Sequence, residues 1–215
     1  MPTRCLICQR KLHDHQTLLQ LILEDEVCLT CRRSLKMKRK VIRMNQLKIT
    51  AFYEYDDFFS DLLIQYKECM DEALKDSFLF EVKDWIRCHY FNCIFVCAPS
   101  TASALKKRGF HHVKQMFEQC GIPIVECFEK KGEFTQKTSS MKERKEISDV
   151  LILNQEKIPK GKRIVLIDDV ATTGSTLLAM QKLLGTEQVK EALCAAIHPK
   201  LLSEYDKNRR MKRIY

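Results

Sequence analysis

Several familiar signals are absent from this sequence of 215 residues. No stretch reaches the roughly 18 uninterrupted apolar residues that a membrane-spanning helix needs. Cys5 and Cys8 stand where a secretory signal would need its apolar core, so we expect no secretion. The chain also lacks the Gly-x-Gly-x-x-Gly dinucleotide fingerprint and the Gly-Lys-[Ser/Thr] ending of a Walker A loop. These absences argue against a membrane-spanning, secreted, dinucleotide-binding or P-loop protein.

The length and the charge of the chain set broad limits on its architecture and partners. A chain of 215 residues can form one α/β domain with a small appendage, burying roughly 70% of its unfolded surface. The net charge of +9 suits anionic partners such as phosphates, nucleic acid or acidic lipid, without choosing among them. Eleven cysteines without a secretory signal indicate a reducing compartment, so we expect a cytoplasmic protein.

Four of these cysteines form two C-x-x-C pairs near the N-terminus, Cys5 with Cys8 and Cys28 with Cys31. Two such pairs can supply the four thiolates of a tetrahedral zinc site, which has no open position and is therefore structural. A redox pair and buried, unliganded cysteines are the alternatives, but a redox motif would not need duplicating. His13 and His15 lie between the pairs and could compete as ligands.

A run of cations follows the second pair, and residues 32–48 contain no acid. One interpretation is a solvated connector or hairpin whose cation stems cover apolar surface. The other is a nucleic-acid contact beside a zinc ribbon. No aromatic residue is interleaved with these cations, so the base-stacking pattern of a single-strand binder is missing.

The most informative stretch is residues 164–177. Residues 164–167 are an apolar run, typical of a parallel strand buried on both faces. Asp168 and Asp169 follow at the strand's carboxyl end, and a turn of hydroxyl residues around Gly174 leads into an apolar segment with helical spacing. Loop amides, hydroxyls and a helix N-terminus together favour a phosphate. Because two carboxylates cannot face that phosphate, their partners should be sugar hydroxyls or a divalent cation, so the pattern predicts a phosphorylated sugar.

Other segments predict the remaining elements of an α/β domain. We expect helices over 56–69 and 70–90, and strands over the four segments 51–55, 94–98, 122–128 and 189–197, the first of them at a sheet edge. We place a zinc ribbon with a basic connector in residues 1–48 and the main domain in 49–215. The remaining cysteines are expected in the core.

Two further segments could contact the ligand. Ligands of open α/β sheets bind outside the carboxyl ends of strands, and there Ser100 and Thr101 follow the second strand. Lys107 and Arg108, next along the chain, could hold a pyrophosphate or could belong to a basic helix face. His111 and His112 could be exposed or could act as general acids. The polar stretch 129–149 is either a functional lid or a disordered insert.

The acidic pair and its loop resemble the signature of the phosphoribosyltransferase family. The resemblance implies a type I phosphoribosyltransferase-like fold, an open parallel sheet with helices on both faces. It implies that Asp168 and Asp169 hold the ribose of phosphoribosyl pyrophosphate together with Mg²⁺. It further implies that the loop binds the 5-phosphate. The substrate-binding set is then Asp168, Asp169, Val170, Ala171, Thr172, Thr173, Gly174, Ser175, Thr176, Ser100, Thr101, Lys107 and Arg108. The stretch before the acid-pair strand would be the family's mobile catalytic loop, with Lys130, Lys131, Gln136, Lys142 and Arg144 closing over pyrophosphate.

Across nearly its whole length the chain is similar to the ComF group of competence proteins. The resemblance is carried by the four cysteines, Tyr53 and Tyr55 with Lys67, Pro99-Ser100, Arg108-Gly109-Phe110, Gln136, Arg144 and the acidic pair. His111 departs from the group, which usually has Asn at this position. The resemblance implies handling of imported single-stranded DNA with a DNA-translocating helicase, at the inner face of the membrane through such partners. Two functions stay open: a module that binds phosphoribosyl pyrophosphate, or an active transferase with Asp168, Asp169 and Arg144 as candidate catalytic residues.

Overall fold

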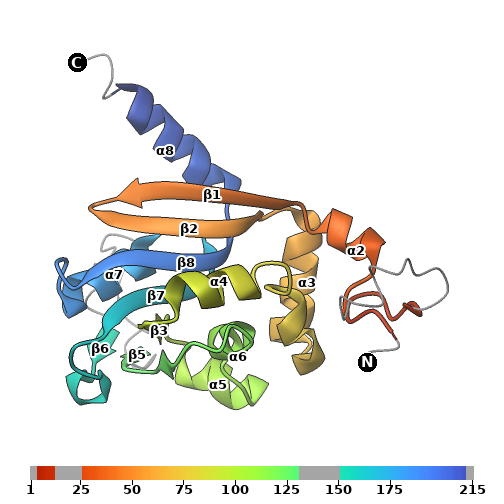
Figure 1. Cartoon of the computed structure of the whole chain (residues 1–215), viewed down its shortest axis with the longest axis horizontal. Coiled ribbons are helices and arrows are strands. Elements are labelled where there is room, and N and C mark those ends of the chain that lie inside the picture. The colour runs from red at the N-terminus through yellow and green to blue at the C-terminus, as the bar shows by residue number, and fades with distance from the viewer. Residues whose placement is uncertain (1–3, 13–25, 131–150, 212–215) are drawn as a thin grey trace, which may run out of the picture.

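The computed structural model describes residues 4–12, 26–130 and 151–211 of the chain. Its centre is a six-stranded sheet with the strand order β1-β2-β8-β7-β3-β4 (Figure 1). All neighbouring pairs are parallel except β1 and β2, which form an antiparallel hairpin. The strands of this sheet are β1 (Met37–Met44), β2 (Leu47–Glu54), β3 (Cys93–Cys97), β4 (Ile124–Val125), β7 (Arg163–Ala171) and β8 (Val189–Ile197).

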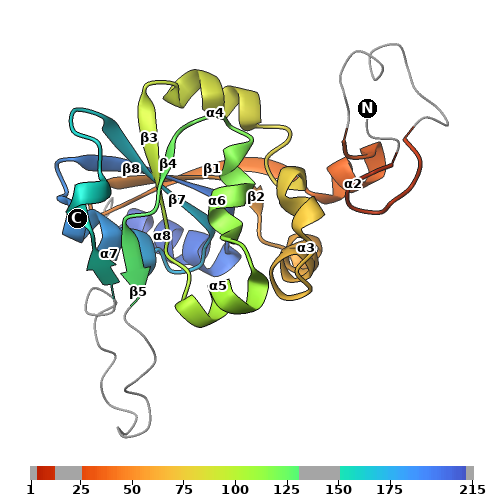
Figure 2. The ribbon, with the colours of Figure 1, turned by 90° about the horizontal axis from the view of Figure 1, so that it is seen from below.

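Helices cover both faces of the sheet because the central strands are apolar on both sides. Residues 164–167 of β7 are all buried, as expected of a parallel strand between two helical layers. One face packs against α3 (Asp57–Glu68), the 3-10 helix η1 (Glu72–Ser77), α4 (Lys83–Tyr90) and α6 (His112–Glu118). The other packs against α7 (Ser175–Leu184), α8 (Pro199–Met211) and the small sheet of β5 (Phe128–Lys130) and β6 (Leu151–Leu153). Figure 2 shows α4 and α7 on opposite sides of the strands.

The basic run after the second cysteine pair is part of this sheet. Residues 37–44 form β1, an edge strand whose Ile42 is 1% exposed while most of its cations are exposed. The predicted boundary at residues 48 and 49 therefore falls inside β2, and the basic connector is in large part an edge strand. β2 is an interior strand between β1 and β8, so the prediction of a sheet edge for residues 51–55 is wrong.

Two other predicted elements differ from the structure. The segment 70–90 is broken: η1 ends at Ser77, a turn follows over residues 78–82, and α4 begins at Lys83. The turn places Phe78, Leu79 and Val82 in the core, and their burial stabilises the break. The predicted strand 122–128 shortens to β4, since Pro123 has no N–H to donate and only its carbonyl bonds to Phe95 N, at 2.8 Å. The expected core role of the remaining cysteines fails for Cys69 and Cys88, which are exposed.

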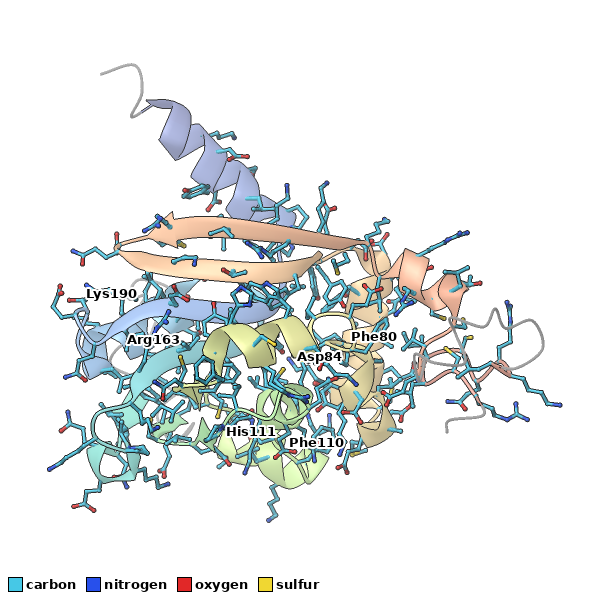
Figure 3. All side chains as sticks on the ribbon, in the orientation of Figure 1. Phe80, Asp84, Phe110, His111, Arg163 and Lys190 are labelled. Carbon is cyan, nitrogen blue, oxygen red and sulfur yellow. The ribbon has the colours of Figure 1, made fainter. Side chains whose placement is uncertain are left out.

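The N-terminal cysteine ribbon (residues 4–12 and 26–36) lies beside α3, at the end of the sheet marked by α2 (Leu29–Ser34) in Figure 1. Its buried residues pack against Phe58 of α3 and Phe80. The Arg32 guanidinium lies 5.1 Å from the centre of the Phe80 ring, which Figure 3 labels near α4. Lys36 pairs at 2.8 Å with Asp56, whose carboxylate caps the N-terminus of α3. The ribbon is thus attached to the main domain by apolar and ionic contacts.

No described helix has both the length and the apolar composition required to cross a membrane.

Candidate functional site

A cavity of about 380 Å³ opens at the carboxyl ends of β3 and β7. Asp168 and Asp169 line it from β7, and Ser100 and Thr101 line it from the turn after β3. These are the strand ends at which open α/β sheets bind ligands. Tyr55, Lys67, His112 and Lys130 also line the cavity. The fold therefore brings together residues that lie more than a hundred positions apart in the chain.

The loop after the acid pair forms a second, smaller hollow of about 20 Å³ beside this cavity. Asp168 and residues 170–177 line it, which covers the predicted phosphate loop. The hydroxyls of Thr173 and Ser175 lie 2.7 Å apart. Gly174 is the N-cap residue of α7 with φ of 71°, and a Cβ there would meet Met44 Sδ at 3.0 Å. A residue without a side chain is thus favoured at this turn.

Asp169 is held by groups of the protein itself. Its Oδ1 accepts the Val170 N–H at 2.6 Å. Its Oδ2 accepts from Lys67 Nζ at 2.8 Å and contacts His112 Nε2 at 3.0 Å. Asp169 is 8% exposed. Burial alone would raise the pKa of this carboxyl, but the His112 hydrogen bond and the Lys67 charge outweigh burial and hold the pKa well below its usual range.

Asp168 is in the opposite situation. Its Oδ1 accepts only the N–H of Asp169, at 2.9 Å, and among the described residues no side chain outside the acid pair bonds to it. Burial, followed by the charge of Asp169, raises the pKa of Asp168 well above its ordinary value. Asp168 is half-buried and lines both hollows. Of the two carboxylates, Asp168 is therefore the one available to a ligand.

The other predicted site residues differ in whether they line the cavity. Arg108 lines the cavity, but its side chain is 6% exposed and its nitrogens bond to Lys67 O at 2.9 Å and His112 Nδ1 at 2.8 Å. Lys107 is 66% exposed, pairs with Glu68 at 3.1 Å and does not line the cavity. Lys130 is the lid candidate that reaches the cavity. Arg144 and the lid candidates Lys131, Gln136 and Lys142 lie outside the described residues.

The four cysteines of the ribbon come together as predicted. The sulfur atoms of Cys5, Cys8, Cys28 and Cys31 all lie within 4.8 Å of one another, a cluster that could hold a metal ion. The Cys8 and Cys28 sulfurs are 3.6 Å apart, close to the spacing of two thiolates on one tetrahedral ion. The Cys28 N–H points to Cys5 Sγ at 3.3 Å, which would stabilise a thiolate. His13 and His15 lie outside the described residues.

Comparison with known proteins agrees with this geometry. A model of the phosphoribosyl transferase domain matches residues 76–215, more than half of the chain. The chain belongs to the phosphoribosyl transferase family. The predicted type I α/β fold with an added four-cysteine ribbon is thereby confirmed, with β1 as an antiparallel edge.

Two curated relatives and one solved structure illustrate the similarity. The chain is 29% identical to competence protein ComFC of Streptococcus pneumoniae over 145 residues, which span 65% of this chain and 64% of the relative. It is 30% identical to an adenine phosphoribosyltransferase of Natranaerobius thermophilus over 113 residues, 52% of this chain and 63% of the relative. The aligned region thus spans less than two thirds of either relative. A crystal structure of adenine phosphoribosyltransferase from Saccharomyces cerevisiae overlaps with a TM-score of 0.38 at 14% identity, covering 80% of this chain and 90% of that one. The resemblance to the ComF group is confirmed by the match to ComFC.

The opposite environments of the two carboxylates predict opposite effects on stability. In wild type, stability falls as pH rises through the raised pKa of Asp168, since the folded state opposes its charge. Asp168→Asn removes that charge, so the free energy of unfolding near neutral pH should stay unchanged or increase. Asp169→Asn leaves Lys67 without its anion and should lower the free energy of unfolding by about 3 kcal/mol. Urea denaturation at pH 7.5 measures both, and equal losses in the two variants would contradict this assignment.

Proposed function

We propose that the protein binds phosphoribosyl pyrophosphate with Mg²⁺ in the cavity at the carboxyl ends of β3 and β7. The observation that carries this proposal is the available carboxylate of Asp168 between the cavity and the phosphate loop. A loop of backbone amides and hydroxyls at the start of α7 suits a dianionic phosphate. A carboxylate beside it suits a ribose hydroxyl or a hydrated Mg²⁺, which prefers oxygen ligands and keeps several waters.

The substrate-binding roles follow from position around the cavity. Residues 170–176 would take the 5-phosphate, and Asp168 the ribose hydroxyls and Mg²⁺. Ser100, Thr101 and the ammonium of Lys130 would face the pyrophosphate, since they line the other wall. Arg108 and Asp169 would act mainly through the groups that they hold in place. Arg144 remains the candidate for closing over the pyrophosphate.

We favour a binding module that serves natural transformation, in line with the similarity to ComFC. In that role the protein would assist the handling of imported single-stranded DNA together with a DNA-translocating helicase, in the cytoplasm or at the inner face of the membrane through its partners. The alternative is an active transferase in which Mg²⁺ and the acid pair orient the ribose while an acceptor attacks its anomeric carbon and pyrophosphate leaves. The similarity to an adenine phosphoribosyltransferase keeps this alternative open.

Calorimetry with phosphoribosyl pyrophosphate distinguishes these possibilities. Binding should require Mg²⁺ and be abolished by EDTA, and ribose 5-phosphate should bind more weakly because it lacks the pyrophosphate. The variant Lys107→Ala, which removes an exposed cation outside the cavity, is the control for loss of positive charge and should bind as wild type does. Pyrophosphate release with one nucleobase or other acceptor would establish the transferase, and binding without release would support the module. Absence of binding in the presence of Mg²⁺ would contradict both.

We further propose that the cysteine cluster holds a structural zinc ion. Four thiolates leave no open coordination position, so the metal would stabilise the ribbon and would not take part in chemistry. Cysteines that bind zinc must stay reduced, which suits a reducing cytoplasm. The ribbon's contacts with Phe58 and Phe80 would then depend on the metal.

Metal analysis of the purified protein in reducing buffer should find one zinc ion per chain. Cys28→Ser should lower both the zinc content and the resistance of the ribbon to proteolysis, because it removes one of four ligands. Cys69→Ser, which changes an exposed cysteine outside the cluster, should leave both unchanged. A zinc content far below one ion per chain in wild type would sink the four-thiolate proposal.

We also propose a nucleic-acid contact on β1. Arg39 and Arg43 are exposed residues of β1, and neither has a carboxylate partner among the described residues. The Arg39 guanidinium lies 4.8 Å from the ring centre of Trp85 on α4. The sequence showed no aromatic residue within the basic run, but the fold supplies one from elsewhere. An aromatic ring beside cations that lack carboxylate partners is a pattern found on single-strand binding surfaces.

Fluorescence anisotropy with a labelled oligothymidine tests this surface. Affinity for the single strand should fall steeply with salt, since binding releases counterions from the phosphates. In the double variant Arg39→Ala with Arg43→Ala, the slope of log affinity against log salt should become shallower by about 1.4, which is about 0.7 for each lost phosphate contact. Lys107→Ala serves as the control because α5 (Ala102–Arg108) lies on the opposite side of the molecule from β1 (Figure 1). An unchanged slope in the double variant would rule out β1 as the contact.

A further inference from the structure

Four side chains from different elements form a continuous chain behind Asp168. Lys67 of α3 bonds to Asp169 of β7 at 2.8 Å, and Asp169 contacts His112 Nε2 of α6 at 3.0 Å. His112 Nδ1 lies 2.8 Å from Arg108 NH1, and Arg108 Nε returns to the carbonyl of Lys67 at 2.9 Å. The contacts thus close into a ring, with the 8% exposed His112 opposite Lys67.

The hydrogen-bonding capacity of these groups decides the form of the imidazole. An arginine guanidinium can only donate hydrogen bonds, so His112 Nδ1 must accept. A neutral imidazole has one donor and one acceptor, so the proton is on Nε2 and points to the carboxylate of Asp169. Ser100 Oγ, 3.3 Å from Nδ1, can donate to the same nitrogen. The backbone of His112 is held as well, since Tyr66 OH donates to its carbonyl at 3.0 Å.

The charged groups around the His112 imidazole disfavour its two other forms, the Nδ1–H tautomer and the imidazolium. Lys67 and Arg108 place two cations near the imidazole, and Asp169 contributes one bonded anion, with the half-buried Asp168 next to it. The His111 ring stacks at 5.9 Å, and Glu68 lies 3.8 Å from Arg108 on the outer side. A proton on Nδ1 would point at the Arg108 guanidinium. Burial, against the opposing effect of Asp169, lowers the pKa of His112 below its ordinary value.

We propose that His112 is a positioning residue that, as the neutral Nε2–H tautomer, joins Asp169 to Arg108 and so keeps Asp168 directed at the ligand. The side chain needs a donor at one end and an acceptor at the other. A glutamine amide offers the same pair, with its NH₂ toward Asp169 and its oxygen toward Arg108. Leucine offers neither, although its size is similar.

The tautomer of His112 can be determined by nitrogen NMR on the protein without any ligand. The full-length protein labelled with ¹⁵N at its six histidines gives ring nitrogen shifts that distinguish the two neutral tautomers and the imidazolium. The signals that disappear in His112→Gln belong to His112. At pH 7.5 we expect a protonated Nε2 and an unprotonated Nδ1. A protonated Nδ1, in either the other tautomer or the imidazolium, would overturn the proposal.

Ligand affinity tests the positioning role, and this part rests on the proposed function. His112→Gln should bind phosphoribosyl pyrophosphate with Mg²⁺ within about threefold of wild type, whereas His112→Leu should lose roughly tenfold or more, as expected when a group that orients a ligating carboxylate is removed. As the pH falls below the ordinary histidine pKa of about 6.5, wild type should weaken relative to His112→Gln, because a protonated Nδ1 repels Arg108. The comparison cancels the titration of the ligand itself.

The outcomes separate this inference from the proposed function. If wild type binds but the Gln and Leu variants have equal affinity, or wild type and the Gln variant share one pH profile, His112 does not position the acid pair. If wild type does not bind, the proposed ligand is wrong, and the nitrogen shifts still decide the tautomer. If His112→Leu does not fold, the pH profile of His112→Gln carries the test.

Discussion

The neutralisation of Asp169 by groups of the protein is the interaction on which the rest of the site depends. Two adjacent carboxylates at the buried end of β7 could not both ionise without partners, since each would lie within the field of the other. Lys67 and His112 bond to one oxygen of Asp169, and a backbone N–H bonds to the other. One carboxylate is thereby fixed as an anion whose two oxygens are already bonded to groups of the protein.

The consequence is a division of roles within the acid pair. Pairs of titratable groups whose environments push their pKa values apart commonly have different tasks in a site. Here Asp169 is bonded to the surrounding side chains, while Asp168 is partly desolvated and has no partner outside the acid pair among the described residues. A bound Mg²⁺ or a ribose hydroxyl would provide that missing partner. Its raised pKa is thus a cost to stability at the point where the ligand would bind.

The part of the fold that could be predicted from sequence is the part set by local pattern. The buried strand β7, the small polar turn at Gly174 and the start of α7 follow from an apolar run, a residue without a Cβ and helical spacing, all within about twenty residues. The cysteine cluster follows from its spacing in the same way. For residues 37–44 the sequence left a connector, a hairpin and a nucleic-acid contact open, because an edge strand tolerates cations along its exposed side. Only the antiparallel pairing with β2 shows that the segment forms one strand of a hairpin.

The interactions within the site depend on contacts that sequence does not display. Lys67 reaches Asp169 across 102 positions and His112 reaches it across 57. The choice between an exposed and an engaged His112 could not be made from its neighbours, and the internal bonding of Arg108 is equally invisible in a basic segment. Only the tertiary arrangement of α3, α5, α6 and β7 brings these groups together.

The central claim is that Asp168, and not Asp169, is the carboxylate that contacts the ligand. Replacing Asp168 should therefore weaken binding and leave the fold intact. The most direct measurement is the Kd of Asp168→Asn for phosphoribosyl pyrophosphate with Mg²⁺, taken on a sample whose urea midpoint is measured alongside. The account predicts a loss of affinity of at least tenfold, about 1.4 kcal/mol, in a protein at least as stable as wild type. Unchanged affinity in that stable variant would contradict it.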